Sequence, residues 1–355
     1  MRIFYAVCGW GLGHATRSLP LLRRLVSEHE VIVYAEGAAL ALLRAELSGA
    51  AVRFVEAVPY PNIFGRALAL RFFARGPALI RAMRAEHAET ESLVAAERID
   101  RVVSDSRWGV SSRRAPSFFI SHHLKQLAPP PLEAAERLTE AVTWRAIRGR
   151  FRRIIVPDVA TDGGLSGRLA HGLRFYAPED LRYVGPLSDV TPRQVARNVD
   201  TLVVLSGPEP SRSRLERRLL PGIARLPGRT VVLRGLPGRE APWPLPDVEA
   251  RPHARKPERD ALFSAARVIV GRSGYTTVMD VARVAARALF IPMPGQTEQE
   301  YLAARLARRG LTHGVAERRV DLARDVPIAA TRPGLTGLAS DGGDPAARAL
   351  DEILA

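Results

Sequence analysis

The sequence predicts an α/β protein made of two doubly wound parallel-sheet domains. The first observation is that short apolar segments alternate with longer segments of helical spacing along the 355 residues, which is the pattern of consecutive βα units. The second is that several of the expected strands run directly into turns rich in glycine and polar residues. The third is the length of the chain, which is enough for two hydrophobic cores.

The order of the expected elements follows from this alternation. Strands of the N-terminal half are expected near residues 2–7, 31–35, 52–55, 101–104, 117–121 and 153–156, and those of the C-terminal half near 201–205, 230–234, 267–270 and 288–291. Glycine, proline and aspartate predict loops that begin at residues 129 and 162, and a third over 331–345. Gly185 and Pro186 begin a polar stretch that we interpret as an interdomain linker. The expected domains are therefore residues 1–185 and 190–340.

The first glycine turn reads CGWGLGH over residues 8–14, between a strand and a helix expected over 15–26. Such a turn brings the backbone close to an anionic ligand. The dinucleotide fingerprint requires a third glycine where this chain has His14, so an NAD-dependent dehydrogenase is disfavoured, although Glu36 follows the second strand as a ribose-binding acid would. His14 either caps the helix or acts on a ligand.

Two further strand–turn–helix units lie within residues 271–301, GRSGYTTVMDVARVAARALFIPMPGQTEQEY. Ser273 lies at the start of the first helix, where backbone N–H groups and the helix dipole suit a phosphate. Asp280, two turns later, is either a ribose ligand or an exposed helix charge. Thr297 and Glu300 have the spacing of a capping box. Because ligands of open parallel sheets bind at the carboxyl ends of strands, these turns predict a nucleotide-sugar site.

An ordered series of motifs resembles the GT-B glycosyltransferases. The motifs are GWGLGHATRS (9–18), SDSRWG (104–109), FFISHH (118–123), YVGPLSD (183–189), LSGPEPSRS (205–213), LRGLPG (233–238), SGYTTVMD (273–280) and PGQTEQEY (294–301). They are most similar to the family 28-like group, which includes the transferase that forms lipid II, and to bacterial proteins described by a family 28 C-terminal domain. The resemblance implies two Rossmann-like domains that face each other across a cleft. It also implies a last helix, at about 345–355, that returns to the first domain.

The same resemblance implies which residues bind the donor. They are Gly11, Gly13, Ser206, Gly207, Ser273, Gly274, Thr276, Asp280, Gln296, Thr297, Glu298 and Gln299. Among them, Asp280 matches the acidic residue that binds the ribose hydroxyls, and Ser206 with Gly207 matches a loop that contacts the diphosphate. Pro208 and Pro210 depart from the family pattern in that loop.

Glycosyl transfer needs a base for the acceptor hydroxyl and a counter-charge for the leaving diphosphate. His14, Asp105 and His122 are the candidate bases, because each follows or ends an expected strand; we expect His14 first and Asp105 second. Arg234 and Arg272 are candidate counter-charges, with a surface position as the alternative.

No metal and no cofactor beyond the nucleotide sugar is expected. GT-B enzymes balance the diphosphate with helix N-termini and cations, and Asp105-Ser106-Arg107 does not form an Asp-x-Asp ligand set. His122 and His123 are a poor metal pair if they lie on a strand, because neighbouring strand residues point to opposite faces.

Arginine supplies most of the net charge of +15, since Lys125 and Lys256 are the only lysines. Residues 66–84 interleave arginines with large apolar side chains. This composition fits a helix that lies on an anionic membrane surface, or one that packs on the sheet and exposes its arginines. Nucleic acid is not an expected partner, because aromatic residues make up only 6% and no recognition motif is present.

Together these features predict a metal-independent, inverting glycosyltransferase. The expected donor is a UDP-sugar, and the expected acceptor is a lipid-linked or cell-envelope glycan. The single cysteine fits the cytoplasm, the start of the chain predicts no signal peptide, and a peripheral position on the inner face of the plasma membrane is expected. Three alternatives stay open: a nucleotide-sugar hydrolase like that of pseudaminic acid synthesis, a nucleotide-sugar 2-epimerase, and a non-catalytic nucleotide-sugar-binding protein.

Overall fold

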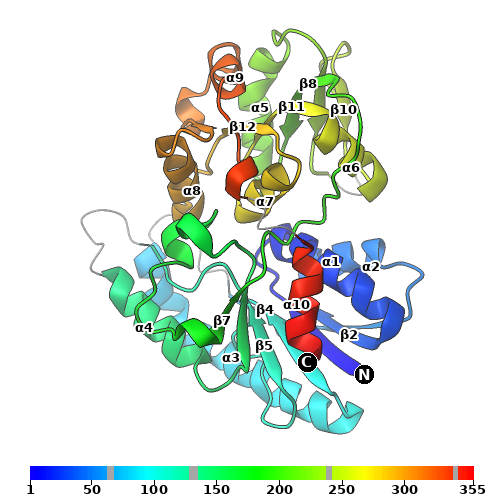
Figure 1. The fold of residues 1–355 in the computed structure, drawn as a ribbon, viewed down its shortest axis with the longest axis vertical. Helices are drawn as coiled ribbons and strands as arrows, with labels where there is room; N and C mark the ends of the chain where they lie inside the picture. The colour runs from blue at the N-terminus through cyan, green and yellow to red at the C-terminus, as the bar shows by residue number, and fades with distance from the viewer. Residues whose placement is uncertain (62–67, 128–134, 237–241, 339–342) are drawn as a thin grey trace. The chain divides into compact units, whose positions relative to one another are not determined.

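The computed structural model describes residues 1–61, 68–127, 135–236, 242–338 and 343–355, with the backbone alone for 68–74. It divides into two compact units, which are coloured along the chain in Figure 1. The first unit comprises Met1–Leu187 and Asp341–Ala355, and the second comprises Ser188–Ser340. Each unit contains one parallel sheet with helices beside it, so the predicted fold class is confirmed.

The sheet of the first unit has seven strands in the spatial order β3-β2-β1-β4-β5-β6-β7. They are β1 (Arg2–Val7), β2 (Glu30–Ala35), β3 (Val52–Glu56), β4 (Arg101–Asp105), β5 (Ser117–Ile120), β6 (Arg153–Val156) and β7 (Leu181–Tyr183). All neighbouring strands are parallel. The central strand β1 is buried on both faces, which explains its continuous apolar sequence.

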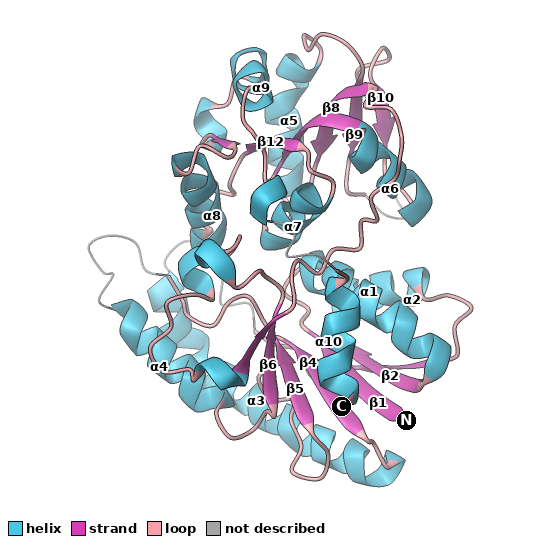
Figure 2. Ribbon diagram, in the orientation of Figure 1, coloured by secondary structure: helices cyan, strands magenta, loops and turns pink. Residues whose placement is uncertain are grey.

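Helices cover both faces of this sheet (Figure 2). One face carries α1 (Leu12–Glu28), α2 (Gly37–Glu46) and α10 (Pro345–Leu354), and the other carries α3 (Leu68–Glu97) and α4 (Ala135–Ile147). Alternating side chains of β1 divide between the two layers. Tyr5 joins the core with Leu22 of α1 and Ala349 of α10, whereas Phe4 joins the core with Val94 of α3.

Helix α10 comes from the far end of the chain and lies beside α1 and β4 (Figure 1). Its N-cap residue Asp344 accepts hydrogen bonds from the backbone N–H groups of Ala346 and Ala347, at 2.9 and 3.3 Å. Asp344 also forms an ion pair with Arg24 of α1. The last residues of the chain thus complete the core of the first unit.

The second unit has a six-stranded parallel sheet in the order β10-β9-β8-β11-β12-β13. The strands are β8 (Val199–Val204), β9 (Thr230–Leu233), β10 (Glu249–Arg251), β11 (Ala266–Gly271), β12 (Arg287–Phe290) and β13 (His313–Gly314). Its helices are α5 (Ser211–Ile223), α6 (Lys256–Ala265), α7 (Tyr275–Arg283), α8 (Thr297–Arg308) and α9 (Leu322–Ala330). Apolar side chains of α5 and α9 form one core cluster with β8, β9, β11 and β12. Helix α6 contacts β8 and β11, and α8 contacts β13.

Most departures from the sequence prediction lie at edges and ends. Strands β7, β10 and β13 were not predicted, because they are two or three residues long and have no apolar run of their own. Helix α1 begins at Leu12, three residues earlier than expected, and α3 continues through Gly76 and Pro77.

The predicted loops are described only in part. Residues 161–163, 167–169 and 178–180 form short 3-10 turns, as do 317–319 and 336–338, the last within the predicted loop 331–345. The loop expected from residue 129 begins outside the described residues. Within the described residues, no helix has both the length and the apolar character needed to cross a membrane.

Candidate functional site

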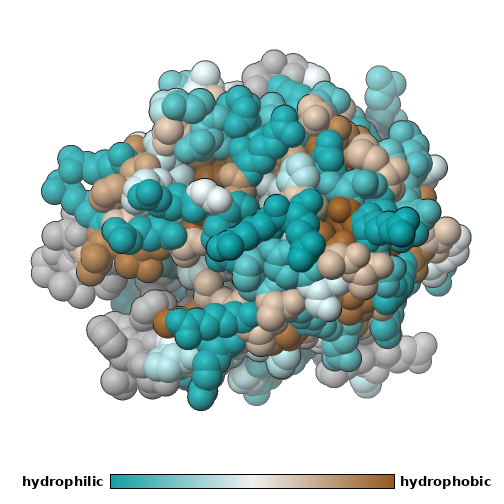
Figure 3. Space-filling view, turned by 90° about the horizontal axis from the view of Figure 1, so that it is seen from below, coloured by the Kyte–Doolittle hydropathy of each residue, from teal (hydrophilic) through white to brown (hydrophobic). Residues whose placement is uncertain are grey.

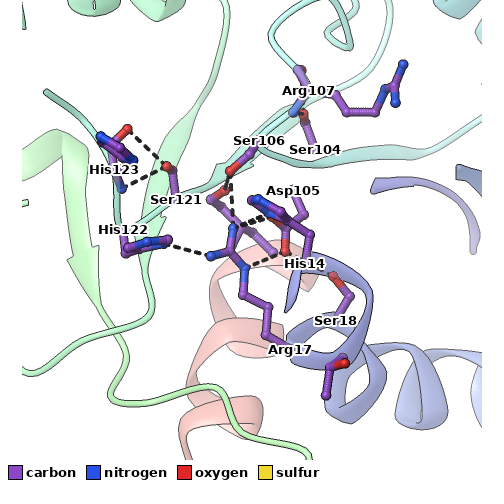
Figure 4. Close-up of polar contacts among 12 residues, drawn as sticks. His14, Arg17, Ser18, Ser104, Asp105, Ser106, Arg107, Ser121, His122 and His123 are labelled. Carbon is purple, nitrogen blue, oxygen red and sulfur yellow. Dashed lines mark hydrogen bonds and ion pairs between the residues drawn. The ribbon is translucent and has the colours of Figure 1, made fainter. Parts of the chain in front are cut away.

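A polar cluster lies at the carboxyl ends of β1, β4 and β5, which are neighbouring strands of the first sheet (Figure 4). Asp105 is the last residue of β4, and His122 follows β5 by two residues. His14 and Arg17 extend from the first turns of α1, which begins just after the glycine turn of β1. The strand order thus brings His14 together with the other two predicted candidate bases, which lie about a hundred residues later in the sequence.

The carboxylate of Asp105 is the centre of this cluster. The Nδ1 atom of His14 lies 2.8 Å from Asp105 Oδ1. Arg17 donates from Nε to Oδ2 at 2.8 Å and forms a second, short contact with Oδ1, and Ser18 donates to Oδ2 at 3.0 Å. Asp105 and Arg17 are fully buried, whereas the side chain of His14 keeps 21% of its surface exposed. A buried ion pair therefore supports a histidine that is open to a ligand.

Burial by itself would raise the pKa of Asp105. The charge of Arg17 and the contact with His14 outweigh burial and hold the pKa of this carboxyl well below its usual range. Because a carboxylate that stays ionised so readily is a weak proton acceptor, Asp105 is poorly suited to be the base itself. The geometry instead suits an orienting role for Asp105 behind His14.

Arg17 and Ser18 are residues of this cluster that the sequence prediction missed. The signal was present in the spacing, because His14, Arg17 and Ser18 occupy positions i, i+3 and i+4 of one helix and so share a face. That face points toward the end of β4, where Asp105 lies. Helical spacing next to an acidic strand end is therefore the pattern that indicates a buried ion pair here.

The glycine turn itself is a structural requirement as well as a candidate ligand site. Gly11 is the N-cap of α1 and has a φ of +120°, which favours glycine, and Gly13 lies in the first turn of α1. A Cβ on Gly9 would lie 2.4 Å from the side chain of Glu36. Glu36 accepts a hydrogen bond from the buried Arg107 at 3.0 Å. Glu36 thus forms an ion pair within the first unit.

His122 and His123 lie beyond the end of β5, not on a strand as the prediction assumed. Their ring centroids are 6.0 Å apart. The argument that strand geometry turns these two side chains to opposite faces is therefore wrong.

The predicted donor residues of the second unit gather at the carboxyl ends of β8, β11 and β12, which are adjacent strands. Ser206 and Gly207 follow β8, Ser273, Gly274 and Thr276 follow β11, and Gln296, Thr297, Glu298 and Gln299 follow β12. The β11 and β12 turns are joined directly, because Ser273 Oγ donates to the carbonyl of Gln299 at 2.8 Å. Gly274 is the N-cap of α7.

The capping box predicted for Thr297 and Glu300 is wrong. Gln296 is the N-cap of α8, and its side chain accepts a hydrogen bond from the backbone N–H of Gln299 at 3.1 Å. Glu300 instead accepts from the backbone N–H of Gly295 at 2.9 Å. The prediction failed because the helix begins one residue earlier than the spacing implied, at Thr297 rather than after it.

Asp280 is buried in the middle of α7, so the alternative of an exposed helix charge is wrong. Its carboxylate accepts a hydrogen bond from Ser188 Oγ at 2.5 Å. Burial raises the pKa of Asp280 to about 6, against the opposing effects of the Ser188 hydrogen bond and the charge of Arg259. An acidic group that is costly to ionise thus lies within the predicted donor domain.

Arg234 and Arg272 are both buried, so the alternative of surface arginines is wrong for each. Arg234 forms two contacts with Glu216, at 3.1 and 2.7 Å. Arg272 lies 2.7 Å from Glu317. Each guanidinium thus contacts a glutamate, which Arg234 shares with Arg212, and the role of the two arginines as counter-charges stays a prediction.

Family models match both ends of this arrangement. Residues 256–326 match the model of the glycosyltransferase family 28 C-terminal domain, and residues 1–62 match that of glycosyl transferase family 1. Both models describe glycosyltransferases, so the chain is a glycosyltransferase similar to family 28. No curated protein matches the sequence of this glycosyltransferase.

Solved structures show that the glycosyltransferase has the GT-B fold over its whole length. The calicheamicin glycosyltransferase CalG4 is 18% identical with a TM-score of 0.63, and the alignment covers 99% of this chain and 97% of that one. The glycotransferase of kitacinnamycin is 18% identical with a TM-score of 0.62 and coverages of 99% and 98%. MurG of Acinetobacter baumannii is 14% identical with a TM-score of 0.56 and the same coverages.

Proposed function

We propose that this glycosyltransferase moves a sugar from a nucleotide sugar to an acceptor hydroxyl with inversion, and that His14 is the general base. The observation that carries the proposal is the 2.8 Å contact between His14 Nδ1 and the ionised Asp105. An ionised carboxylate only accepts hydrogen bonds, so the proton of a neutral His14 lies on Nδ1. The other ring nitrogen, Nε2, then carries the lone pair.

The proposed step is a single displacement at the anomeric carbon. His14 Nε2 takes the proton of the acceptor hydroxyl while its oxygen forms the new bond to that carbon. The bond from the anomeric carbon to the donor diphosphate breaks, and the diphosphate leaves with the electron pair. Asp105 stabilises the imidazolium that forms, as the buried aspartate does in hydrolase triads. Attack opposite the leaving group inverts the configuration.

The donor is proposed to bind at the carboxyl ends of β8, β11 and β12. The N-terminus of α7, with Gly274 as its N-cap, suits the diphosphate, and Asp280 is proposed to bind the ribose hydroxyls. We expect no metal and no further cofactor. UDP is the expected nucleotide. Thymidine diphosphate is the rival, because the structurally similar spinosyn rhamnosyltransferase SpnG, at 15% identity and a TM-score of 0.60, was solved with it.

The proposed acceptor is a lipid-linked or cell-envelope glycan, used by a cytoplasmic protein at the inner face of the plasma membrane. Within the segment 66–84, the side chains of 66–74 lie outside the described residues. In the remainder, Ile80 is 51% exposed and lies beside the exposed Arg81 and Arg84. This arrangement fits contact with an anionic surface. The face seen in Figure 3 is largely hydrophilic, with hydrophobic residues in small groups.

Acceptors of another class are favoured by the similarity to glycosyltransferases of kitacinnamycin and calicheamicin, whose names point to small aglycones. The deciding assay follows nucleoside diphosphate release from UDP- and dTDP-sugars, with membrane lipid extract, with soluble aglycones and with neither. Release that needs lipid supports the proposal, and release that needs an aglycone replaces the acceptor. Equal release with free sugar in buffer alone would make the protein a hydrolase.

Two variants test whether donor binding and catalysis belong to different sites. Asp280→Ala should abolish the thermal shift that the donor produces, whereas His14→Ala should keep that shift and lose transfer. If both variants lose donor binding equally, the assignment of His14 as base is wrong. Sedimentation with anionic vesicles, comparing the intact protein with Ile80→Ser, checks the membrane contact separately; equal sedimentation would remove it from the proposal.

A further inference from the structure

The guanidinium of Arg17 lies between two histidines of the first unit (Figure 4). On one side its NH1 atom is 2.7 Å from His122 Nδ1. On the other side its NH2 atom is 2.9 Å from His14 Nδ1 and also contacts Asp105. Ser106 Oγ accepts from NH2 as well, at 3.1 Å. Arg17 is 2% exposed, so these protein groups define the surroundings of its charge.

These distances determine where each histidine carries its proton. A guanidinium only donates, so His122 Nδ1 accepts from Arg17 and the proton of neutral His122 lies on Nε2. His14 Nδ1 faces the same guanidinium, but it also lies 2.8 Å from Asp105 Oδ1. Arg17 NH2 has Asp105 and Ser106 as other acceptors, so it does not need the lone pair of His14. The ionised Asp105 can only accept, so His14 Nδ1 carries the proton and donates it to Asp105, and its contact with Arg17 is then not a hydrogen bond.

We propose that Arg17 is a positioning residue that holds His14 and His122 in opposite tautomers. By keeping Asp105 ionised, Arg17 leaves His14 with a bare Nε2, and by donating to His122 it leaves that ring with an Nε2–H. In their neutral forms the two rings would act oppositely, His14 as an acceptor and His122 as a donor. One buried arginine thus builds a base and a hydrogen-bond donor at one edge of the sheet.

This arrangement removes His122 from the candidate bases. A base needs a lone pair to receive the acceptor proton, and the lone pair of His122 is engaged by Arg17. An Nε2–H group is instead suited to bind an oxygen of the acceptor, such as a neighbouring hydroxyl or a ring oxygen. This assignment of chemical roles rests on the proposed function, whereas the two tautomers do not depend on it.

The tautomers can be read without any activity assay. Long-range ¹H–¹⁵N correlation spectra of the ¹⁵N-labelled protein distinguish protonated from bare ring nitrogens, and His14→Gln and His122→Gln assign the two rings. We expect a proton on Nδ1 of His14 and on Nε2 of His122. Finding the same tautomer in both rings, or a bare Nδ1 in His14, would overturn the proposal even if the protein transfers sugar.

The variant Arg17→Lys tests whether the arginine is the cause. A lysine keeps the positive charge beside Asp105 but lacks the planar fork that reaches both histidines at once. We expect His14 to keep its proton on Nδ1, while His122 loses its single tautomer and shows averaged nitrogen shifts. Transfer should fall about 10²-fold in kcat at unchanged donor binding, as for a small misplacement of reacting groups.

A matched control is Arg23→Lys on the same helix, where the arginine forms an ion pair with Glu46. This variant should change neither the histidine tautomers nor kcat. If Arg17→Lys also keeps both tautomers, Arg17 does not position the histidines. If the tautomers change as expected but no donor is ever turned over, the positioning role stands and the proposed function fails.

Discussion

Asp105 in the first unit and Asp280 in the second are both buried, yet their ionisation differs in direction. Asp105 is 1% exposed and lies against Arg17, and its pKa is held well below the usual range. Asp280 is 8% exposed and accepts one hydrogen bond from Ser188, and burial raises its pKa to about 6. Burial penalises both carboxylates; the arginine in contact decides the outcome.

The two buried aspartates therefore differ in kind. Asp105 carries a permanent negative charge, whereas ionising Asp280 lowers the free energy of unfolding. Asp105 is ionised under all ordinary conditions, so it can hold a proton on His14 without competing for it. Asp280 is ionised at neutral pH only at the expense of stability. Such a cost is common where a group must serve a ligand, because ribose hydroxyls that donate to Asp280 would stabilise its charged form.

The largest expected effect is that of Asp105→Asn. The change removes one partner of a buried ion pair and leaves the charge of Arg17 uncompensated, which typically costs about 3–5 kcal/mol. Denaturant unfolding at pH 7 should show this loss, and transfer should fall with it because a neutral amide no longer stabilises the imidazolium that His14 becomes. A variant that is as stable as the parent would contradict the ion-pair account.

The second effect is on catalysis alone. His14→Gln removes the proposed base from a site that is partly exposed, so stability should change little. Loss of a general base typically lowers the rate about 10²- to 10⁴-fold. Donor binding, followed by thermal shift or calorimetry, should stay the same because all predicted donor side chains lie in the second unit, and only the two glycines Gly11 and Gly13 lie in the first. A rate within threefold of the parent would remove His14 from the mechanism.

Asp280→Asn should have the opposite sign to Asp105→Asn. Asparagine keeps the shape and the hydrogen bond from Ser188 but carries no charge, so the cost of ionising a buried group disappears. A pKa of about 6 in place of 3.8 corresponds to about 3 kcal/mol at most, and the variant should be more stable by up to that amount at pH 7. Donor binding should weaken. A destabilised variant that still binds donor would contradict the claim that the two buried aspartates differ in their effect on stability.

The pH dependence of stability should reveal the same group. Between pH 4 and pH 6 the folded protein holds a proton on Asp280 that the unfolded chain has lost, so the contribution of Asp280 falls as pH rises through this range. Above pH 6 the contribution is constant. The difference in unfolding free energy between Asp280→Asn and the parent should therefore grow from pH 4 to 6 and then level. A flat difference would show that burial does not shift this carboxyl.

The smallest expected effect is that of Ser188→Ala. Removing the hydroxyl takes away one hydrogen bond to the charged form of Asp280, which is worth about 1.5–3 kcal/mol at pH 7. The pKa of Asp280 should rise further. In the background of Asp280→Asn the same change should cost less, about 1 kcal/mol, because the bond is then between neutral groups. Equal costs in both backgrounds would contradict a charge-assisted bond.

Much of the fold was predictable because central parallel strands have strong local signals. The ranges expected for β1 to β6, and for β8, β9, β11 and β12, agree with the structure within two residues at each end. Strand β1 is buried on both faces and its sequence is continuously apolar, so its position is readable from composition. The edge strands β7, β10 and β13 lack such runs, because edge positions bury less and need fewer apolar residues.

For the two candidate sites, the sequence identified single residues but not the contacts between them. The glycine turn identified His14, and the strand end identified Asp105, but their contact depends on the pairing of β1 with β4. Gln296 as the cap of α8 was missed because glutamine is an unusual cap and the position of Thr297 suggested a better one. The sequence left open whether Asp280 is buried or exposed. Its hydrogen-bond partner Ser188 lies 92 positions earlier, so no local pattern around Asp280 reveals its surroundings.

The sequence by itself determined the alternation of strands and helices, the two glycine-rich edges and the residue types available there. These properties are local, since they follow from hydrophobic periodicity and backbone freedom over a few neighbouring residues. The tertiary structure alone decided that Arg17 contacts Asp105 and two histidines, while Asp280 contacts a serine and, among the described residues, no arginine. Those pairings fix the charge of each aspartate, because electrostatic energies depend on distance and burial and not on position in the chain.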